Sequence, residues 1–178
     1  NIPFGYIGTF TDDRKALITT KDGGVLVTTR KYGLNDNRQF RKAVVDLSPD
    51  GSATSTVKTE YRGVLYDKIY QVLHMDEVDS RKFVLDHISI PAFSLVSYSH
   101  QEEKSFIPVI REDLNLKLSN YGIIMGNRIL FKPNLMTRIE KLPYRTKDRK
   151  SEISIRRPYN EIDTVIFRLP ARYKLDKM

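Results

Sequence analysis

Residues 43–61 read AVVDLSPDGSATSTVKTEY and have the pattern of a β-hairpin. Ala43 to Leu47 form one apolar strand, and Ala53 to Tyr61 form a second strand that is rich in Ser and Thr. Between them Pro49 fixes φ at the first corner of the turn, and Gly51 accepts the left-handed conformation. The stretch therefore predicts two antiparallel strands, the second with one face in contact with water.

Further strands are predicted on both sides of this hairpin. An earlier hairpin turns at Lys21-Asp22-Gly23-Gly24, and a later one turns at Gly126-Asn127, where glycine at the first corner favours a type II′ turn. Residues 114–118 alternate leucine with polar residues, which places leucine on one face of a strand. The expected strands are residues 15–20, 25–29, 93–98, 114–118, 121–125, 128–132, 151–156 and 163–169. In the last part of the chain we expect Ile153, Ile155, Val165, Phe167 and Leu169 to face inward.

Only one region of the sequence has a pattern that predicts helix. From Val64 to His87 there is no Gly or Pro, and apolar residues recur at helical spacing. Asp76 can cap a second helix within this region. The residues expected to face the core are Leu65, Ile69, Val72 and Leu73, then Val78, Leu85 and Ile88. The whole pattern favours a mainly β fold, an antiparallel β-sandwich-like domain with one short helical segment.

Composition narrows the possible chemistry. A chain of 178 residues with 40% hydrophobic residues is long enough to bury a real core. It has no run of 18 apolar residues, so no membrane span is predicted. It also has no cysteine, which excludes disulfides, thiolate zinc sites and a cysteine nucleophile within this chain.

The net charge of +8 is concentrated in two short stretches. Residues 138–157 carry eight basic and three acidic side chains, and residues 30–42 carry five basic and one acidic, which leaves −1 elsewhere. Cationic side chains interleaved with tyrosines are typical of surfaces that bind single-stranded nucleic acid, and they also attract anionic envelope polymers. A solvated loop between two strands is the simpler explanation and the one we favour, because the acidic residues of the stretch would interrupt a phosphate track. The candidate binding residues are Arg138, Lys141, Tyr144, Arg145, Lys147, Arg149, Lys150, Arg156, Arg157 and Tyr159.

No catalytic, metal-binding or cofactor-binding residue is predicted. His74, His87 and His100 are each 13 residues apart, without the short spacings that aim two imidazoles at one metal. We expect them to be surface or half-buried side chains. The acidic pairs are sequence neighbours, which cannot face each other across a cleft as glycosidase carboxylates do.

The first 24 residues carry a family resemblance. The segments PFGYIG (3–8), TDDR (11–14), ALITT (16–20) and GG (23–24) resemble exported, multi-domain transglutaminase-like proteins of Bacteroidetes-type bacteria, which are related to cysteine proteases. In that family this stretch directly follows the last catalytic segment of a papain-like core, and a β-rich region of uncharacterised function comes next. The catalytic Cys, His and third residue of the family would then lie upstream of residue 1.

The resemblance implies a domain organisation and a location. Residues 1–36 would be the C-terminal hairpin of the transglutaminase-like core with a linker, and residues 37–178 a β-rich accessory domain that continues beyond the chain and leaves an open sheet edge. The location would be periplasmic or associated with the cell envelope, and the partner would be the upstream catalytic domain. The loop expected to contact that domain contains Phe4, Tyr6, Asp12, Asp13 and Arg14.

The function expected on these grounds is that of a non-catalytic accessory or structural domain. Two alternatives stay open: a module that binds carbohydrate or another envelope polymer, and a nucleic-acid binder that uses residues 138–157. No cofactor is expected for any of the three.

Overall fold

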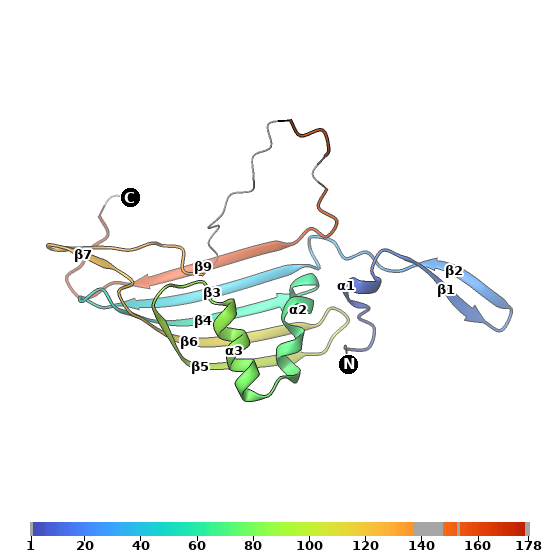
Figure 1. Cartoon of the computed structure of the whole chain (residues 1–178), viewed down its shortest axis with the longest axis horizontal. Coiled ribbons are helices and arrows are strands. Elements are labelled where there is room, and N and C mark those ends of the chain that lie inside the picture. Colours follow the sequence, from blue (N-terminus) through green and yellow to red (C-terminus); the bar gives the residue numbers. More distant parts are fainter. Residues whose placement is uncertain (1, 137–147, 153, 177–178) are drawn as a thin grey trace.

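A central sheet of five strands organises the molecule (Figure 1). The computed structural model describes residues 2–136, 148–152 and 154–176. In spatial order the strands are β5 (Phe93–Glu103), β6 (Val109–Leu118), β4 (Ala53–Arg62), β3 (Arg38–Leu47) and β9 (Asn160–Arg168). The pairs β5–β6, β6–β4 and β4–β3 are antiparallel, whereas β9 runs parallel to β3.

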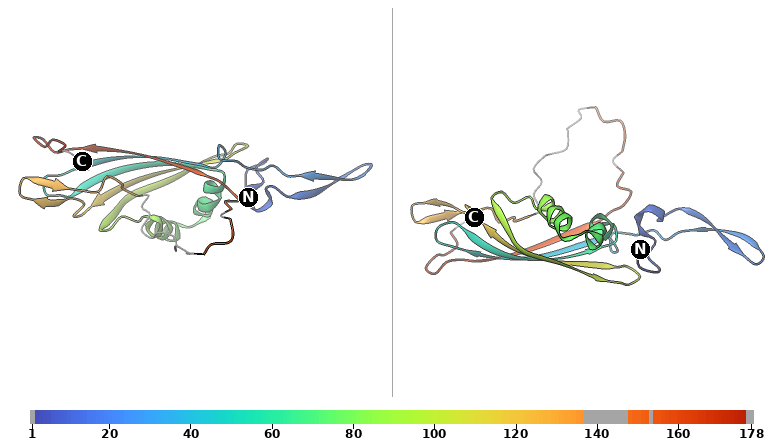
Figure 2. Two further views of the ribbon diagram at one scale, coloured as in Figure 1. Left: turned by 90° about the horizontal axis from the view of Figure 1, so that it is seen from above. Right: turned by 60° about the horizontal axis from the view of Figure 1, so that its bottom comes forward.

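Two small hairpins lie outside this sheet. The first pairs β1 (Lys15–Thr20) with β2 (Gly23–Thr28), and the second pairs β7 (Ile123–Met125) with β8 (Arg128–Leu130). The second turn lies at Gly126-Asn127 as predicted, and Gly126 has a φ of 62°. The first turn consists of Lys21 and Asp22, and Gly23 and Gly24 belong to β2. The β1–β2 hairpin projects away from the body of the molecule (Figures 1 and 2).

Helices cover one face of the sheet (Figure 2). They are α2 (Val64–Ile69), the short 3₁₀ helix η1 (Tyr70–His74) and α3 (Glu77–His87), while the single turn α1 (Gly8–Thr11) lies beside α2. The predicted cap of α3 is confirmed, because the Asp76 carboxylate accepts a hydrogen bond of 2.8 Å from the Asp79 amide. Among the described residues no helix is both long and apolar enough to cross a membrane.

The inner face of α3 differs from the prediction. Val78 is 77% exposed and Leu85 is 38% exposed, whereas Val84 and Ile88 are buried against the sheet. Only Ile88 of the three residues predicted to face the core does so. The prediction of a helix is correct, but the face predicted to be buried, which was chosen by its most apolar residues, is wrong. Ser80 is buried in the structure, and Val78 is not.

Two apolar clusters fill the space between sheet and helices. Under α3, the predicted row of Leu114, Leu116 and Leu118 packs with Val84 and Ile88. Under α2, four tyrosine rings form the centre of the second cluster, together with Leu65, Ile69 and Ile110. These tyrosines are Tyr6, Tyr32, Tyr61 and Tyr66, each at most 9% exposed.

The tyrosine cluster joins the N-terminal segment to the sheet domain. The Tyr6 ring lies 5.3 Å from the Tyr32 ring and 5.6 Å from the Tyr66 ring, measured between centroids. Such aromatic pairs contribute about 1 kcal/mol each beyond the burial of their area. The boundary expected near residue 36 stays a prediction, and the tyrosines on both sides of it share one core.

Asn37 fixes the point where the N-terminal segment enters the sheet. Its side chain is fully buried, with Oδ1 accepting from the Val64 amide at 2.9 Å and Nδ2 donating to the Pro158 carbonyl at 3.0 Å. Its own carbonyl accepts from the Asn160 amide at 2.9 Å. One residue thereby positions the start of α2 and the start of β9.

The mainly β class is confirmed, with two differences inside it. Helices, rather than a second large sheet, cover the central sheet, and β9 is parallel instead of antiparallel. Parallel strands need a long connection, and residues 48–159 lie between β3 and β9 in the chain. The predicted strand at 151–156 is absent from the described residues of that stretch, where Ile155 is 70% exposed instead of facing inward. Ile153 lies outside the described residues.

Candidate functional site

A row of polar side chains crosses the helix-covered face of the central sheet. The strand registers place one residue from each of the five strands in line, and we call these five the polar row. From one edge of the sheet to the other they are Asp163, Arg41, Thr59, Glu112 and His100. The row separates the apolar cluster under α3 from the tyrosine cluster under α2.

Ion pairs and hydrogen bonds link the residues of the polar row. Arg41 Nη1 lies 3.5 Å from Asp163 Oδ2, and Arg41 Nε donates to Thr59 Oγ1 at 3.2 Å. Across the sheet, His100 Nε2 lies 3.0 Å from Glu112 Oε2. The side chains of Arg41, Glu112 and His100 are only 11%, 10% and 7% exposed. Buried charges are tolerated when they are paired in this way.

Tyr61 extends the row toward the tyrosine cluster. Its hydroxyl donates to Glu112 Oε1 at 2.9 Å, so the carboxylate lies between the Tyr61 hydroxyl and the His100 imidazole. Burial, followed by the negative charge of Glu112, raises the pKa of Tyr61. The hydroxyl is therefore held as a hydrogen-bond donor, and the imidazole is not placed to remove its proton.

A cavity of about 320 Å³ opens above the polar row. Its floor includes Arg41, Tyr61 and Glu112, and its walls include Leu65 of α2 and Val84 of α3. An apolar cavity with a few convergent polar groups is the ordinary form of a small-molecule site. Here the floor groups are hydrogen-bonded to one another, which is the arrangement of a structural network.

His87 and His74 belong to local aromatic contacts. The His87 ring stacks on Phe83 at 4.0 Å, and its Nδ1 lies 2.7 Å from the Phe83 carbonyl oxygen. His74 packs edge-on against Tyr70 at 4.9 Å. Across residues 2–136, 148–152 and 154–176, no three His, Asp or Glu side chains are grouped to hold a metal ion.

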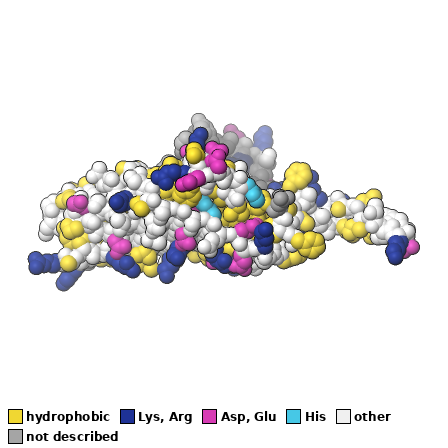
Figure 3. Space-filling view, turned by 90° about the horizontal axis from the view of Figure 1, so that it is seen from below, with side chains coloured by type: hydrophobic (Ala, Val, Ile, Leu, Met, Phe, Trp, Pro, Cys, Tyr) yellow, Lys and Arg dark blue, Asp and Glu magenta, His cyan; other side chains and the backbone are white. Residues whose placement is uncertain are grey.

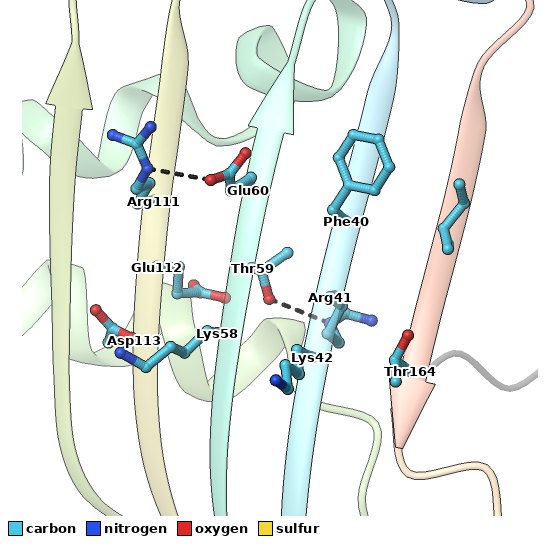
Figure 4. A pocket seen from close by; sticks show the side chains of 11 residues that line it. Phe40, Arg41, Lys42, Lys58, Thr59, Glu60, Arg111, Glu112, Asp113 and Thr164 are labelled. Carbon is cyan, nitrogen blue, oxygen red and sulfur yellow. Dashed lines mark hydrogen bonds and ion pairs between the residues drawn. The ribbon is translucent and has the colours of Figure 1, made fainter. Parts of the chain in front are cut away.

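The opposite face of the sheet is open and charged, and its centre forms a shallow groove of about 340 Å³ (Figure 4). Arg111 Nε lies 3.2 Å from Glu60 Oε1, and Lys58 Nζ lies 3.4 Å from Asp113 Oδ1. These cross-strand pairs are typical of a solvated sheet face. The lining also contains two apolar residues, Phe40 of β3 and Ile162 of β9, at the side of the groove formed by these two strands.

The predicted basic stretch is only partly described. Arg138, Lys141, Tyr144, Arg145 and Lys147 lie outside the described residues. Arg149, Lys150 and Arg156 are exposed.

Arg157 and Tyr159 contact the chain itself. Arg157 forms an ion pair with Asp12, with its Nη2 2.6 Å from Asp12 Oδ1, and it also donates to the Thr9 carbonyl. The Tyr159 ring lies under the Lys68 ammonium, with 4.7 Å from Nζ to the ring centroid. Arg157 therefore connects the two sets of residues that the sequence singled out.

The other residues of the N-terminal loop divide between the body and the solvent. Tyr6 is buried, and its hydroxyl donates to Asp67 Oδ1 at 3.0 Å. Asp13 lies 3.0 Å from Lys31 Nζ, and the Arg14 guanidinium stands 5.1 Å from the centroid of the Phe10 ring. Phe4 is fully exposed.

The β1–β2 hairpin is apolar on both of its faces. Leu17 pairs with Leu26 on one face and Ile18 pairs with Val25 on the other, and their exposed fractions are 67%, 66%, 50% and 50%. Hydrophobic side chains are visible along it in the space-filling view (Figure 3). Most exposed apolar side chains in proteins are scattered singly, whereas here four of them lie together on one hairpin.

Residues 127–178 match a family of unknown function. The family is described as a Domain of Unknown Function with solved-structure structure, DUF3858. The matched segment contains β8 and β9, and with them Asp163 of the polar row and Arg157. It does not reach the first 24 residues, which carry the resemblance to transglutaminase-like proteins. No curated protein matches the chain, and no solved structure matches it.

Sequence reasoning missed the polar row. The sequence did contain a sign of it. Arg41 lies two residues from Ala43 and Glu112 lies two residues from Leu114, so each charged residue is on the inward face of its strand. A charged residue at an inward position must find a buried partner. Which partner it finds depends on strand order, and no local pattern gives that order.

Proposed function

We propose that this chain is a non-catalytic accessory module of a larger exported transglutaminase-like protein, and that the β1–β2 hairpin packs against the catalytic core of that protein. The observation that carries the proposal is the exposure of Leu17, Leu26, Ile18 and Val25 on both faces of a projecting hairpin. A two-stranded hairpin is marginally stable alone in water, so an apolar one needs a surface to cover it.

The contacts of the N-terminal loop favour this arrangement. Tyr6 and Asp12 anchor the loop to the sheet domain, whereas Phe4 and Phe10 point their rings into solvent, with exposed fractions of 103% and 79%. The loop is thus fixed on one side and apolar on the other. A neighbouring domain that packs on the exposed side of the loop would therefore be held in place relative to the central sheet.

The polar row supports a structural rather than a catalytic role for the sheet domain. Nucleophilic catalysis needs a nucleophile in contact with its base. Here Glu112 separates the Tyr61 hydroxyl from the His100 imidazole, and the raised pKa of Tyr61 opposes its ionisation. The thiolate chemistry of the proposed parent would belong to its catalytic domain, in the periplasm or at the cell envelope.

The test introduces the same substitution into two proteins, the 178-residue chain and the longer protein proposed to contain it. Leu17→Lys should lower the unfolding temperature of the longer protein, because it places a charge in a buried contact. It should leave the unfolding temperature of the 178-residue chain unchanged, because Leu17 is exposed there. An equal effect in both proteins, or robust peptide hydrolysis by the 178-residue chain, would count against the proposal.

A second candidate function is binding of an anionic polymer by the basic stretch. It is favoured by the exposure of Arg149, Lys150 and Arg156. Binding of an acidic polysaccharide or of single-stranded nucleic acid should then weaken steeply as salt is added. Reversal of Arg149 and Lys150 to Glu should abolish it, and the same affinity after reversal would exclude this function.

A further inference from the structure

The two edges of the central sheet are built differently. At the β5 edge a register shift interrupts the ladder between Leu95 and Ser97, and Arg81 Nη2 donates to the Leu95 carbonyl at 3.0 Å. Bulges and covered edge groups of this kind prevent a strand from pairing with another chain. The β5 edge is therefore protected.

The β9 edge carries no such protection among the described residues. Its nine residues pair with β3 without a register shift, and they include no Pro, Gly or Lys. Asp163 is exposed as a residue although only 22% of its side chain is exposed, so its backbone provides much of that open surface. An unbroken strand with an open backbone is a template for pairing with another strand.

Apolar side chains lie beside this open backbone. On the uncovered face of the sheet, Ile162 stands next to Phe40 and Ile166 stands next to Val44. The two isoleucines are 43% and 41% exposed. Figure 4 shows Phe40 on the strand adjacent to β9, at the uncovered face. The edge therefore combines unpaired backbone groups with a stripe of apolar surface.

We propose that β9 pairs antiparallel with β9 of a second copy, about a two-fold axis at Thr164, and joins two sheets into one of ten strands. Thr164 is the midpoint of Asn160–Arg168, so this register uses all nine residues. Ile162 then faces Ile166 of the partner subunit, and Asn160 faces Arg168 of the partner subunit. Asp163 faces Val165 of the partner subunit, and Glu161 faces Phe167 of the partner subunit.

Charge disfavours the registers whose axis lies nearer the start of β9, and an axis nearer its end pairs fewer of the nine residues. An axis at Asp163 would place the two Asp163 carboxylates opposite each other, and an axis at Ile162 would place Glu161 opposite Asp163 of the partner subunit. Like charges directly opposite in a sheet are destabilising. The axis at Thr164 has no such pair and matches isoleucine to isoleucine, which is the self-complementarity that a two-fold interface requires.

The proposal is tested by the mass of the 178-residue chain in solution, measured by light scattering and sedimentation. We expect a dimer whose population rises with protein concentration. Ile162→Lys combined with Ile166→Lys should give a folded monomer, because two lysines then face each other across the axis in each pair. Circular dichroism checks that this variant keeps its fold.

A charge-swapped variant tests the register itself. Ile162→Lys combined with Ile166→Glu introduces the same number of charges but places lysine opposite glutamate, so the dimer should be retained. Val96→Lys, at an exposed position of the protected β5 edge, should leave the dimer unchanged. A monomeric native chain, or a double-lysine variant that still forms dimers, would overturn the proposal.

Discussion

Asp12 and Arg157, which are 145 residues apart in the sequence, form a two-pronged ion pair. Arg157 Nε lies 3.1 Å and Nη2 lies 2.6 Å from Asp12 Oδ1, and the Asp12 side chain is only 4% exposed. Hydrogen bonding to Asp12 raises the pKa of Arg157. The pair ties the N-terminal loop to the segment that leads into β9.

The first prediction concerns this pair. Arg157→Ala should destabilise the chain by about 2 kcal/mol, because it leaves a buried carboxylate without its partner. Arg156→Ala is the matched control, since Arg156 is the exposed neighbour, and its effect should stay within about 0.5 kcal/mol. The measurement is the midpoint of urea unfolding. Equal midpoints for the two variants would show that the ion pair does not anchor the loop.

The second prediction concerns the polar row. Glu112→Ala should cost about 3 kcal/mol, because both the Tyr61 hydroxyl and the His100 imidazole lose their partner in a buried site. Asp113→Ala, one residue further along β6 on the open face, removes only an exposed pair with Lys58 and should cost less than about 1 kcal/mol. Denaturant unfolding of the two variants compares them directly. A cost for Glu112→Ala no larger than that of Asp113→Ala would contradict the structural role of the row.

The third prediction concerns alkaline pH. Tyr6, Tyr61 and Tyr66 each donate to a carboxylate, and burial is the largest cause that raises their pKa above the usual 10.0. The folded chain therefore keeps protons that unfolded tyrosines release. This stabilisation is complete below pH 10.0 and is lost as the pH rises above it.

Tyrosinate absorbance and circular dichroism, followed together against pH, measure this effect. The buried tyrosines should ionise only as the fold is lost. Tyr61→Phe removes one of the titrating groups, so its stability should fall less steeply with pH in the alkaline range. Ionisation of all ten tyrosines near pH 10.0 with the fold intact would refute the prediction.

The fourth prediction concerns the entry to α2. Gly63 has a φ of 59°, and a Cβ there would overlap Asn37 Oδ1, the atom that accepts from the Val64 amide. Gly63→Ala should cost more than about 2 kcal/mol. Gly126→Ala has a similar φ of 62° but open space around its Cβ, so it should cost about 1 kcal/mol. Thermal unfolding of both variants separates the steric effect from the backbone effect, and equal costs would exclude the steric one.

Local patterns predicted the local structure well. The turns at Gly51 and Gly126, the cap at Asp76 and the alternation of Leu114 to Leu118 depend on a few neighbouring residues, and the structure confirms each of them. Glycine conformation, side-chain capping and strand parity are properties of short segments.

Long-range features were the ones that failed or were missed. The parallel pairing of β9 and the alignment of Asp163 with Arg41 depend on where a distant strand returns to the sheet. His100 was expected to be a surface or half-buried residue, and it is half-buried, but its contact with Glu112 was missed because β5 places the imidazole beside that carboxylate. Strand order decided these outcomes, and strand order depends on the packing of the whole chain.

Hydrogen exchange at the amides of residues 15–28 is the most direct test of the accessory role, measured in the 178-residue chain and in the longer transglutaminase-like protein proposed to contain it. The central strands β4 and β6 serve as the internal reference for slow exchange. We expect the hairpin to exchange rapidly in the 178-residue chain and slowly in the longer protein, where the catalytic core would cover its apolar faces. Rapid exchange in both proteins would contradict the proposed docking of this module.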